Sequence, residues 1–131
     1  MLDVIGRTAL ERAFATVRQE RIQALLIATA GPLLDQRAEV VQFAAKEKLP
    51  AVYGRHEYVV AGGLMSYGFD VPEMYRRSAT YVDRILRGES PGDLPVQAPT
   101  KFELIINLKA AKQIGLTIPP NVLARAEKVI R

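Results

Sequence analysis

Ser66 and His56 are the residue types that could carry nucleophilic catalysis in this chain. A serine hydroxyl becomes a nucleophile when a neighbouring histidine takes its proton. The nucleophile elbow of hydrolases needs glycine two residues before and two residues after the serine. Gly68 meets the second condition, but Leu64 stands at the first position. We therefore expect the hydroxyl to satisfy a backbone group, and we expect the protein not to be an enzyme.

Metal and nucleotide chemistry have little support in the sequence. His56 is the only histidine and cysteine is absent, so His56 beside Glu57 lacks the further ligands that a zinc site needs. No glycine-rich phosphate loop ending in lysine occurs. Gly62-Gly63 followed by Gly68 has the wrong spacing for a dinucleotide fingerprint. We expect no metal and no cofactor.

The elements that must position these residues alternate between helix and strand. Apolar residues at helical spacing predict helices over 7–20, 33–48 and 71–88, the last capped by Asp70. Short apolar runs predict strands over 24–28, 51–53, 64–67 and 102–106. Residues 55–61 fit either one helical turn or a loop, and 89–100 is a proline-rich connector. Asn107 caps a helix over 108–114, and a last helix is expected from 121 to about 130. This order predicts an α/β fold, a Rossmann-like parallel sheet with helices on both faces.

Length and composition fit one globular domain. The chain has 131 residues, of which 49% are hydrophobic and 24% charged. The net charge of +4 is spread along the chain, so we expect no nucleic-acid partner. The first residues do not show a signal peptide, which predicts a cytoplasmic location for the chain as written.

Several motifs resemble one protein family. They are AGGLMSYG at 61–68, ILRG at 85–88, PTKFELIINLK at 99–109 and GLTIPP at 115–120. From about residue 14 to the end, the chain resembles ABC-transporter substrate-binding proteins of the tryptophan/tyrosine-transport type. The resemblance implies a type I periplasmic-binding-protein fold, in which two Rossmann-like lobes hold a solute between them.

The match covers the second lobe and the segment after it. We therefore expect residues 1–98 to form a second-lobe domain with the start of the return crossover. Residues 99–131 would be the strand and helices that join the first lobe in relatives. Full-length relatives are periplasmic and would deliver solute to an ABC permease, provided that they carry an export signal and a first lobe.

The resemblance implies a solute-binding component that binds a small amino-acid-like or aromatic solute without chemistry. Ligands of open α/β sheets bind beyond the carboxyl ends of the strands. Arg55 could hold a carboxylate through two hydrogen bonds. Tyr67 could stack on a flat group, or it could pack at the rim of the sheet. The candidate ligand contacts are Thr29, Ala30, Gly54, Arg55, Ser66 and Tyr67.

A different class of function stays open beside this one. The chain could be a cytoplasmic lobe remnant that binds no solute and acts as a dimerising structural or interaction domain. Without a first lobe, residues 102–130 should expose apolar surface, which association tends to bury. We therefore expect a homodimer formed through the C-terminal segment.

Overall fold

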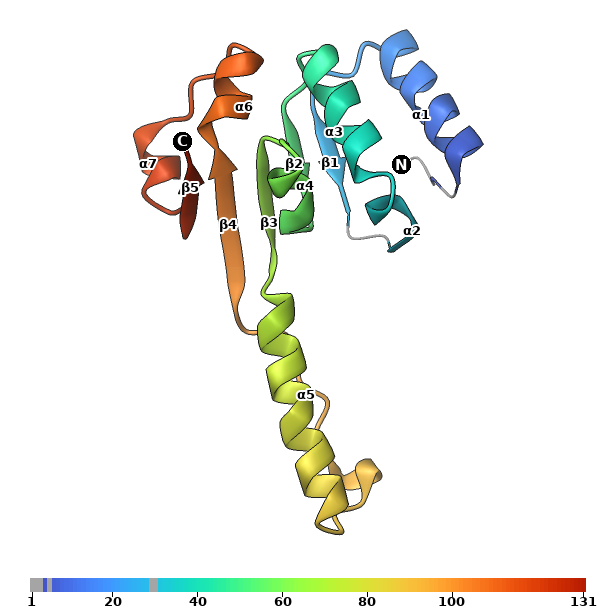
Figure 1. Ribbon diagram of the computed structural model, residues 1–131, viewed down its shortest axis with the longest axis vertical. Coiled ribbons are helices and arrows are strands. Elements are labelled where there is room, and N and C mark those ends of the chain that lie inside the picture. The colour runs from blue at the N-terminus through green and yellow to red at the C-terminus, as the bar shows by residue number, and fades with distance from the viewer. Residues whose placement is uncertain (1–3, 5, 29–30) are drawn as a thin grey trace. The chain divides into compact units, whose positions relative to one another are not determined.

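The computed structural model describes residues 4, 6–28 and 31–131 (Figure 1). The chain forms two compact units, which are described separately. One unit comprises Met1–Gly68 and Glu103–Arg131, and carries most of the sheet; the other comprises Phe69–Phe102. The predicted boundary at 98/99 concerns membership of lobes in full-length relatives, and it stays a prediction.

A five-stranded sheet runs through the chain in the order β1-β2-β3-β4-β5. The strands are β1 (Leu25–Ile27), β2 (Ala51–Tyr53), β3 (Met65–Phe69), β4 (Phe102–Asn107) and β5 (Lys128–Ile130). Strands β1, β2 and β3 are parallel to one another, as predicted, and β4 is parallel to β5.

Strands β3 and β4 run in opposite directions, so the sheet is mixed. The backbone N–H of Asn107 donates to the carbonyl of Leu64 at 2.8 Å, and that of Asp70 donates to Lys101 at 3.2 Å. Residue numbers therefore rise along β3 while those of the paired residues fall along β4, which is the antiparallel pattern. The connection between β3 and β4 explains this reversal, because it comes back to the same end of the strands from which it left.

The helices confirm most sequence predictions. They are α1 (Arg7–Gln19), α2 (Gly31–Leu34), α3 (Arg37–Lys46), α4 (His56–Val60), α5 (Val71–Leu86), α6 (Leu108–Gln113) and α7 (Pro120–Leu123), with a 3₁₀ turn η1 (Pro91–Asp93) in the connector. The single helix expected over 33–48 is wrong, because α2 ends at Leu34. The Arg37 guanidinium donates to the Leu34 carbonyl at 3.1 Å and thereby satisfies one free end of that helix. Among the described residues, none of the helices combines the length and apolar character that crossing a bilayer requires.

The prediction of a helix from 121 to 130 is wrong beyond Leu123. Residues Lys128–Ile130 instead form β5 at the edge of the sheet. Glu127 begins this pairing, since its N–H donates to the Leu104 carbonyl at 3.0 Å and its carboxylate accepts from the Leu104 N–H at 2.5 Å. Pairing with β4 therefore overrides the local helical pattern.

Two apolar clusters lie within the larger unit. One joins α1, α3, α4 and β2 through Leu10, Val40, Val41, Ala44, Ala51, Tyr53 and Tyr58. The other joins Leu64 to the C-terminal segment through Ile106, Ala110, Ala111 and Ile118. The expectation that residues 102–130 expose their apolar side chains is therefore wrong for these four residues, because the strands and α6 bury them against one another.

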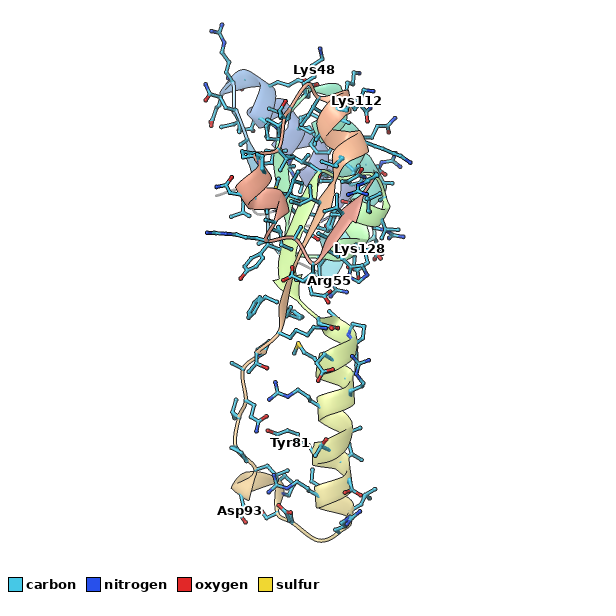
Figure 2. The ribbon with its side chains drawn as sticks, turned by 90° about the vertical axis from the view of Figure 1, so that its left-hand side faces the viewer. Lys48, Arg55, Tyr81, Asp93, Lys112 and Lys128 are labelled. Carbon is cyan, nitrogen blue, oxygen red and sulfur yellow. The ribbon has the colours of Figure 1, made fainter. Side chains whose placement is uncertain are left out.

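The Phe69–Phe102 unit consists of α5 and the segment that returns beside it. The Asp70 carboxylate caps α5 by accepting from the Glu73 N–H at 3.0 Å. It also accepts from Lys101 Nζ at 2.7 Å, and this contact lowers the pKa of Asp70 below its usual value. Figure 2 shows Tyr81 on α5, whose hydroxyl donates to the Pro95 carbonyl at 2.6 Å and holds the return segment. Helix α5 has no buried residue.

Candidate functional site

The carboxyl ends of β1, β2 and β3 meet at one edge of the sheet. Ile27 pairs with Tyr53, and Tyr53 pairs with Ser66. The N–H of Gly54 donates to the Ile27 carbonyl at 2.9 Å, which extends the ladder past the end of β2. The residues that follow these strands are therefore neighbours, as ligand binding at such an edge requires.

Four of the six predicted contacts lie at this edge, namely Gly54, Arg55, Ser66 and Tyr67. Thr29 and Ala30 lie outside the described residues. Gly54 and Gly68 bring the ends of β2 and β3 together, since an added Cβ at Gly68 would lie only 2.2 Å from the Gly54 carbonyl oxygen. Glycine at position 68 is thus needed for a close approach of two backbones.

Ser66 and Tyr67 point to opposite faces of β3, because successive residues alternate along a strand. Ser66 is 2% exposed, whereas Tyr67 is 58% exposed. The phenol ring of Tyr67 is thus accessible to a solute. The hydroxyl of Ser66 would have to be uncovered first, and its role as a ligand contact stays a prediction.

Arg55 is held by Glu57 at the start of α4. Arg55 Nε donates to Glu57 Oε2 at 3.1 Å, and a second guanidinium nitrogen donates to Glu57 Oε1. This two-point contact lowers the pKa of the Glu57 carboxyl. His56 Nδ1 also lies 3.5 Å from Glu57 Oε2. Figure 2 labels Arg55 near the end of the sheet from which the connection to α5 leaves.

This arrangement has a chemical consequence for binding. A bidentate pair orients the guanidinium, and a solute carboxylate would have to share Arg55 with Glu57 or replace it. The sequence analysis did not select Glu57 as a site residue. An acidic residue two positions after an arginine at a strand end is the signal that could have identified it.

Tyr53 belongs to the core. It is 1% exposed and stacks on Tyr58, with ring centroids 4.8 Å apart. Burial raises the pKa of both phenols, and the proximity of Tyr58 adds to the rise at Tyr53. Among the part of the chain that the structure describes, no cluster of His, Cys, Asp or Glu could hold a metal ion.

Comparison with known proteins gives a consistent result. The family model described as ABC transporter substrate binding protein matches residues 8–130. A tyrosine-binding protein of Clostridioides difficile is 25% identical over 96 residues, which are 73% of this chain and 28% of that protein.

Two solved structures are also similar. A conserved domain protein from Vibrio cholerae O1 biovar El Tor is 31% identical with a TM-score of 0.85, covering 93% of this chain and 41% of its own. An ABC domain from Streptococcus pneumoniae in complex with L-Trp is 28% identical with a TM-score of 0.79, covering 88% and 39%. The chain thus spans less than half the length of each of these relatives. The match over residues 8–130 shows that the chain belongs to the ABC transporter substrate-binding protein family, a family of solute-binding proteins rather than enzymes.

Proposed function

We propose that the chain supplies one side of a binding site for a small amino-acid-like or aromatic solute and performs no chemistry on it. The observation that carries this proposal is the shared edge at which β1, β2 and β3 end in register, with Arg55 and the exposed ring of Tyr67. The names of two relatives support the solute class, since one is a tyrosine-binding protein and another was solved with L-Trp.

Each contact has a distinct role in the proposal. Arg55, oriented by Glu57, receives the carboxylate of the solute. Tyr67 stacks on its flat side chain. The backbone around Gly54, together with Ser66, Thr29 and Ala30, contributes hydrogen bonds and shape.

One edge of a sheet cannot enclose a solute, and enclosure supplies much of the affinity of small-molecule sites. We propose that the rest of the site is formed by a part that corresponds to the remaining length of the relatives, which is more than half of each. A solute bound between both parts would then pass to an ABC permease as partner.

A thermal-shift titration with L-Trp, L-Tyr and L-Phe, and with D-Trp as a stereochemical control, tests the proposal. A solute that binds only the folded chain raises its melting temperature as the concentration passes the dissociation constant. We expect a saturating, stereoselective shift that Tyr67→Ala and Arg55→Ala each reduce. Val60→Ala is the matched control, because Val60 is 75% exposed on α4 and is not among the proposed contacts. An unchanged shift in both site variants would refute the assigned contacts.

The alternative is a lobe that binds no solute and acts as a dimerising structural or interaction domain inside the cell. The exposed apolar side chains of α5 favour it. A folded chain that shows no shift with any of the four solutes, and that self-associates, would support this alternative.

A further inference from the structure

His56 lies beside the ion pair of Arg55 and Glu57 and contacts it loosely. Two nitrogens of the Arg55 guanidinium donate to the Glu57 carboxylate, with Nε 3.1 Å from Oε2. His56 Nδ1 lies 3.5 Å from the same Oε2 atom, which is longer than an ordinary N–H···O hydrogen bond. The His56 side chain is 45% exposed, so the imidazole has room to move toward the carboxylate.

Solute binding through Arg55 has a cost at Glu57. If a solute carboxylate takes the guanidinium, the Glu57 carboxylate loses its cation, although its side chain is only 28% exposed. A partly buried carboxylate without a charged partner is unfavourable. A protonated His56 can donate to Glu57 Oε2 and keep this carboxylate paired, whereas a neutral imidazole brings no compensating charge.

The other charges around His56 stay constant where histidine titrates. Glu57 remains ionised there, because the hydrogen bond from Arg55 lowers the pKa of its carboxyl. Helix α4 also contacts α3 and β2. From α3, the permanent positive charge of Arg37 reaches α4, and from β2 the buried phenol of Tyr53 stays neutral because burial raises its pKa. His56 is the only histidine of the chain, so a change of charge between pH 5 and 8 points to this one side chain.

We propose that His56 is the alternative partner of Glu57, and that protonation of His56 promotes the transfer of Arg55 from Glu57 to a solute carboxylate. The inference rests on the proposed function, because it concerns the same carboxylate contact. His56 acts here as a positioning residue, through Glu57, and does not have to touch the solute. By linkage, protonation of His56 and solute binding favour each other, so the affinity rises as the pH falls and is lower when His56 is neutral.

Calorimetric titration of the whole chain with L-Trp at pH 5.5 and pH 7.0 tests the proposal. The carboxylate and ammonium groups of a free amino acid keep their charges over this range. We expect the dissociation constant to fall by about two- to fivefold from pH 7.0 to pH 5.5, the range for a partly exposed ion pair. His56→Gln should remove this dependence, and His56→Lys, which carries a permanent charge, should bind equally well at both pH values. Val60→Gln is the matched control one turn later on α4, and should keep the dependence of the original chain.

A measurement without solute separates failure of this inference from failure of the proposed function. At pH 5.5, the Arg55 Nε–H should exchange with water faster in the original chain than in His56→Gln, because protonated His56 draws Glu57 away from it. At pH 7.0 the two proteins should exchange alike. NMR follows this proton whether or not a solute binds.

The two measurements together give a decision in every case. If L-Trp binds at neither pH, the proposed function fails, and the exchange of the Arg55 proton alone decides the role of His56. Equal exchange in both proteins at pH 5.5 would overturn that role. So would L-Trp binding that is independent of pH, or that depends on pH equally in His56→Gln.

Discussion

At the residue scale, the pair Arg55–Glu57 bears directly on the proposed binding of a solute carboxylate. The guanidinium is already bonded at two points to a carboxylate of its own chain. If Arg55 receives the solute as proposed, an incoming carboxylate would have to exchange with Glu57, and the net gain in binding free energy would be smaller than for an arginine without such a contact. The proposal therefore favours solutes that also contact the exposed ring of Tyr67.

The lowered pKa of Glu57 predicts how this pair responds to acid. The stabilisation from the pair is complete above the usual glutamate pKa and is lost as the pH falls through the lowered value. In a carbon-13 NMR titration, the Glu57 carboxyl should titrate below the usual glutamate range. Arg55→Gln should raise its midpoint, because the hydrogen bond from Arg55 is the largest cause of the shift. An identical midpoint in both proteins would disprove this account.

Gly68 predicts a stability effect at the same edge. An alanine Cβ would overlap the Gly54 carbonyl, and the two strand ends would have to separate. We expect Gly68→Ala to lower the free energy of unfolding by about 1–3 kcal/mol. Gly92→Ala is the control, because its nearest neighbour, Ser90 Oγ, is 3.7 Å away. Urea unfolding of both variants measures the difference, and equal midpoints would contradict the close approach.

At the element scale, local signals in the sequence were reliable where a side chain satisfies its own backbone. The Asp70 cap and the Asn107 cap were both predicted and are both confirmed. Strand β2 has the predicted bounds. Elements that depend on distant partners were not predictable from periodicity. The break after Leu34 and the change from helix to β5 after Leu123 arise from contacts that local patterns do not contain.

Asn107 provides a test of capping at the start of α6. Its side-chain oxygen accepts from the N–H groups of Lys109 and Ala110 at 3.0 and 3.2 Å, in a largely buried position. Asn107→Ala leaves both donors without this acceptor and should cost about 1–2 kcal/mol of stability. Asn107→Asp keeps an acceptor and should cost less in thermal unfolding. A similar loss in both variants would point to packing rather than capping.

At the scale of the whole molecule, the sequence predicted the α/β class and the parallel β1–β3 core, but the reversal at β4 was missed. An apolar run such as Phe102–Ile106 predicts a buried strand in either direction, because the ladder direction depends on where the preceding connection returns. The candidate site was likewise predictable only in part. Strand ends could be located from the sequence, whereas the burial of Ser66 and the engagement of Arg55 required the neighbouring strands and α4.

Residues 71–100 form a segment that begins and ends at neighbouring positions, so we predict that this segment can be removed. Asp70 and Lys101 are already hydrogen-bonded neighbours, so an Asn-Gly turn can replace residues 71–100. We expect the shortened chain to keep the sheet and both apolar clusters, because these lie in the other unit. Dispersed amide signals in its NMR spectrum would confirm this. An unfolded spectrum would show that the sheet requires α5.

The stacked tyrosines in the core give the protein an optical property. The chain contains no tryptophan, and Tyr53 and Tyr58 are stacked with ring planes inclined by 10°. Because these phenols are buried in a fixed, asymmetric arrangement, we expect them to give a near-ultraviolet circular dichroism band that is lost when the packing is lost. An exposed ring such as that of Tyr75 averages over orientations and adds little. The band therefore reports the folding of the sheet unit without an added label, and light that excites only indole would detect a bound tryptophan against a dark protein.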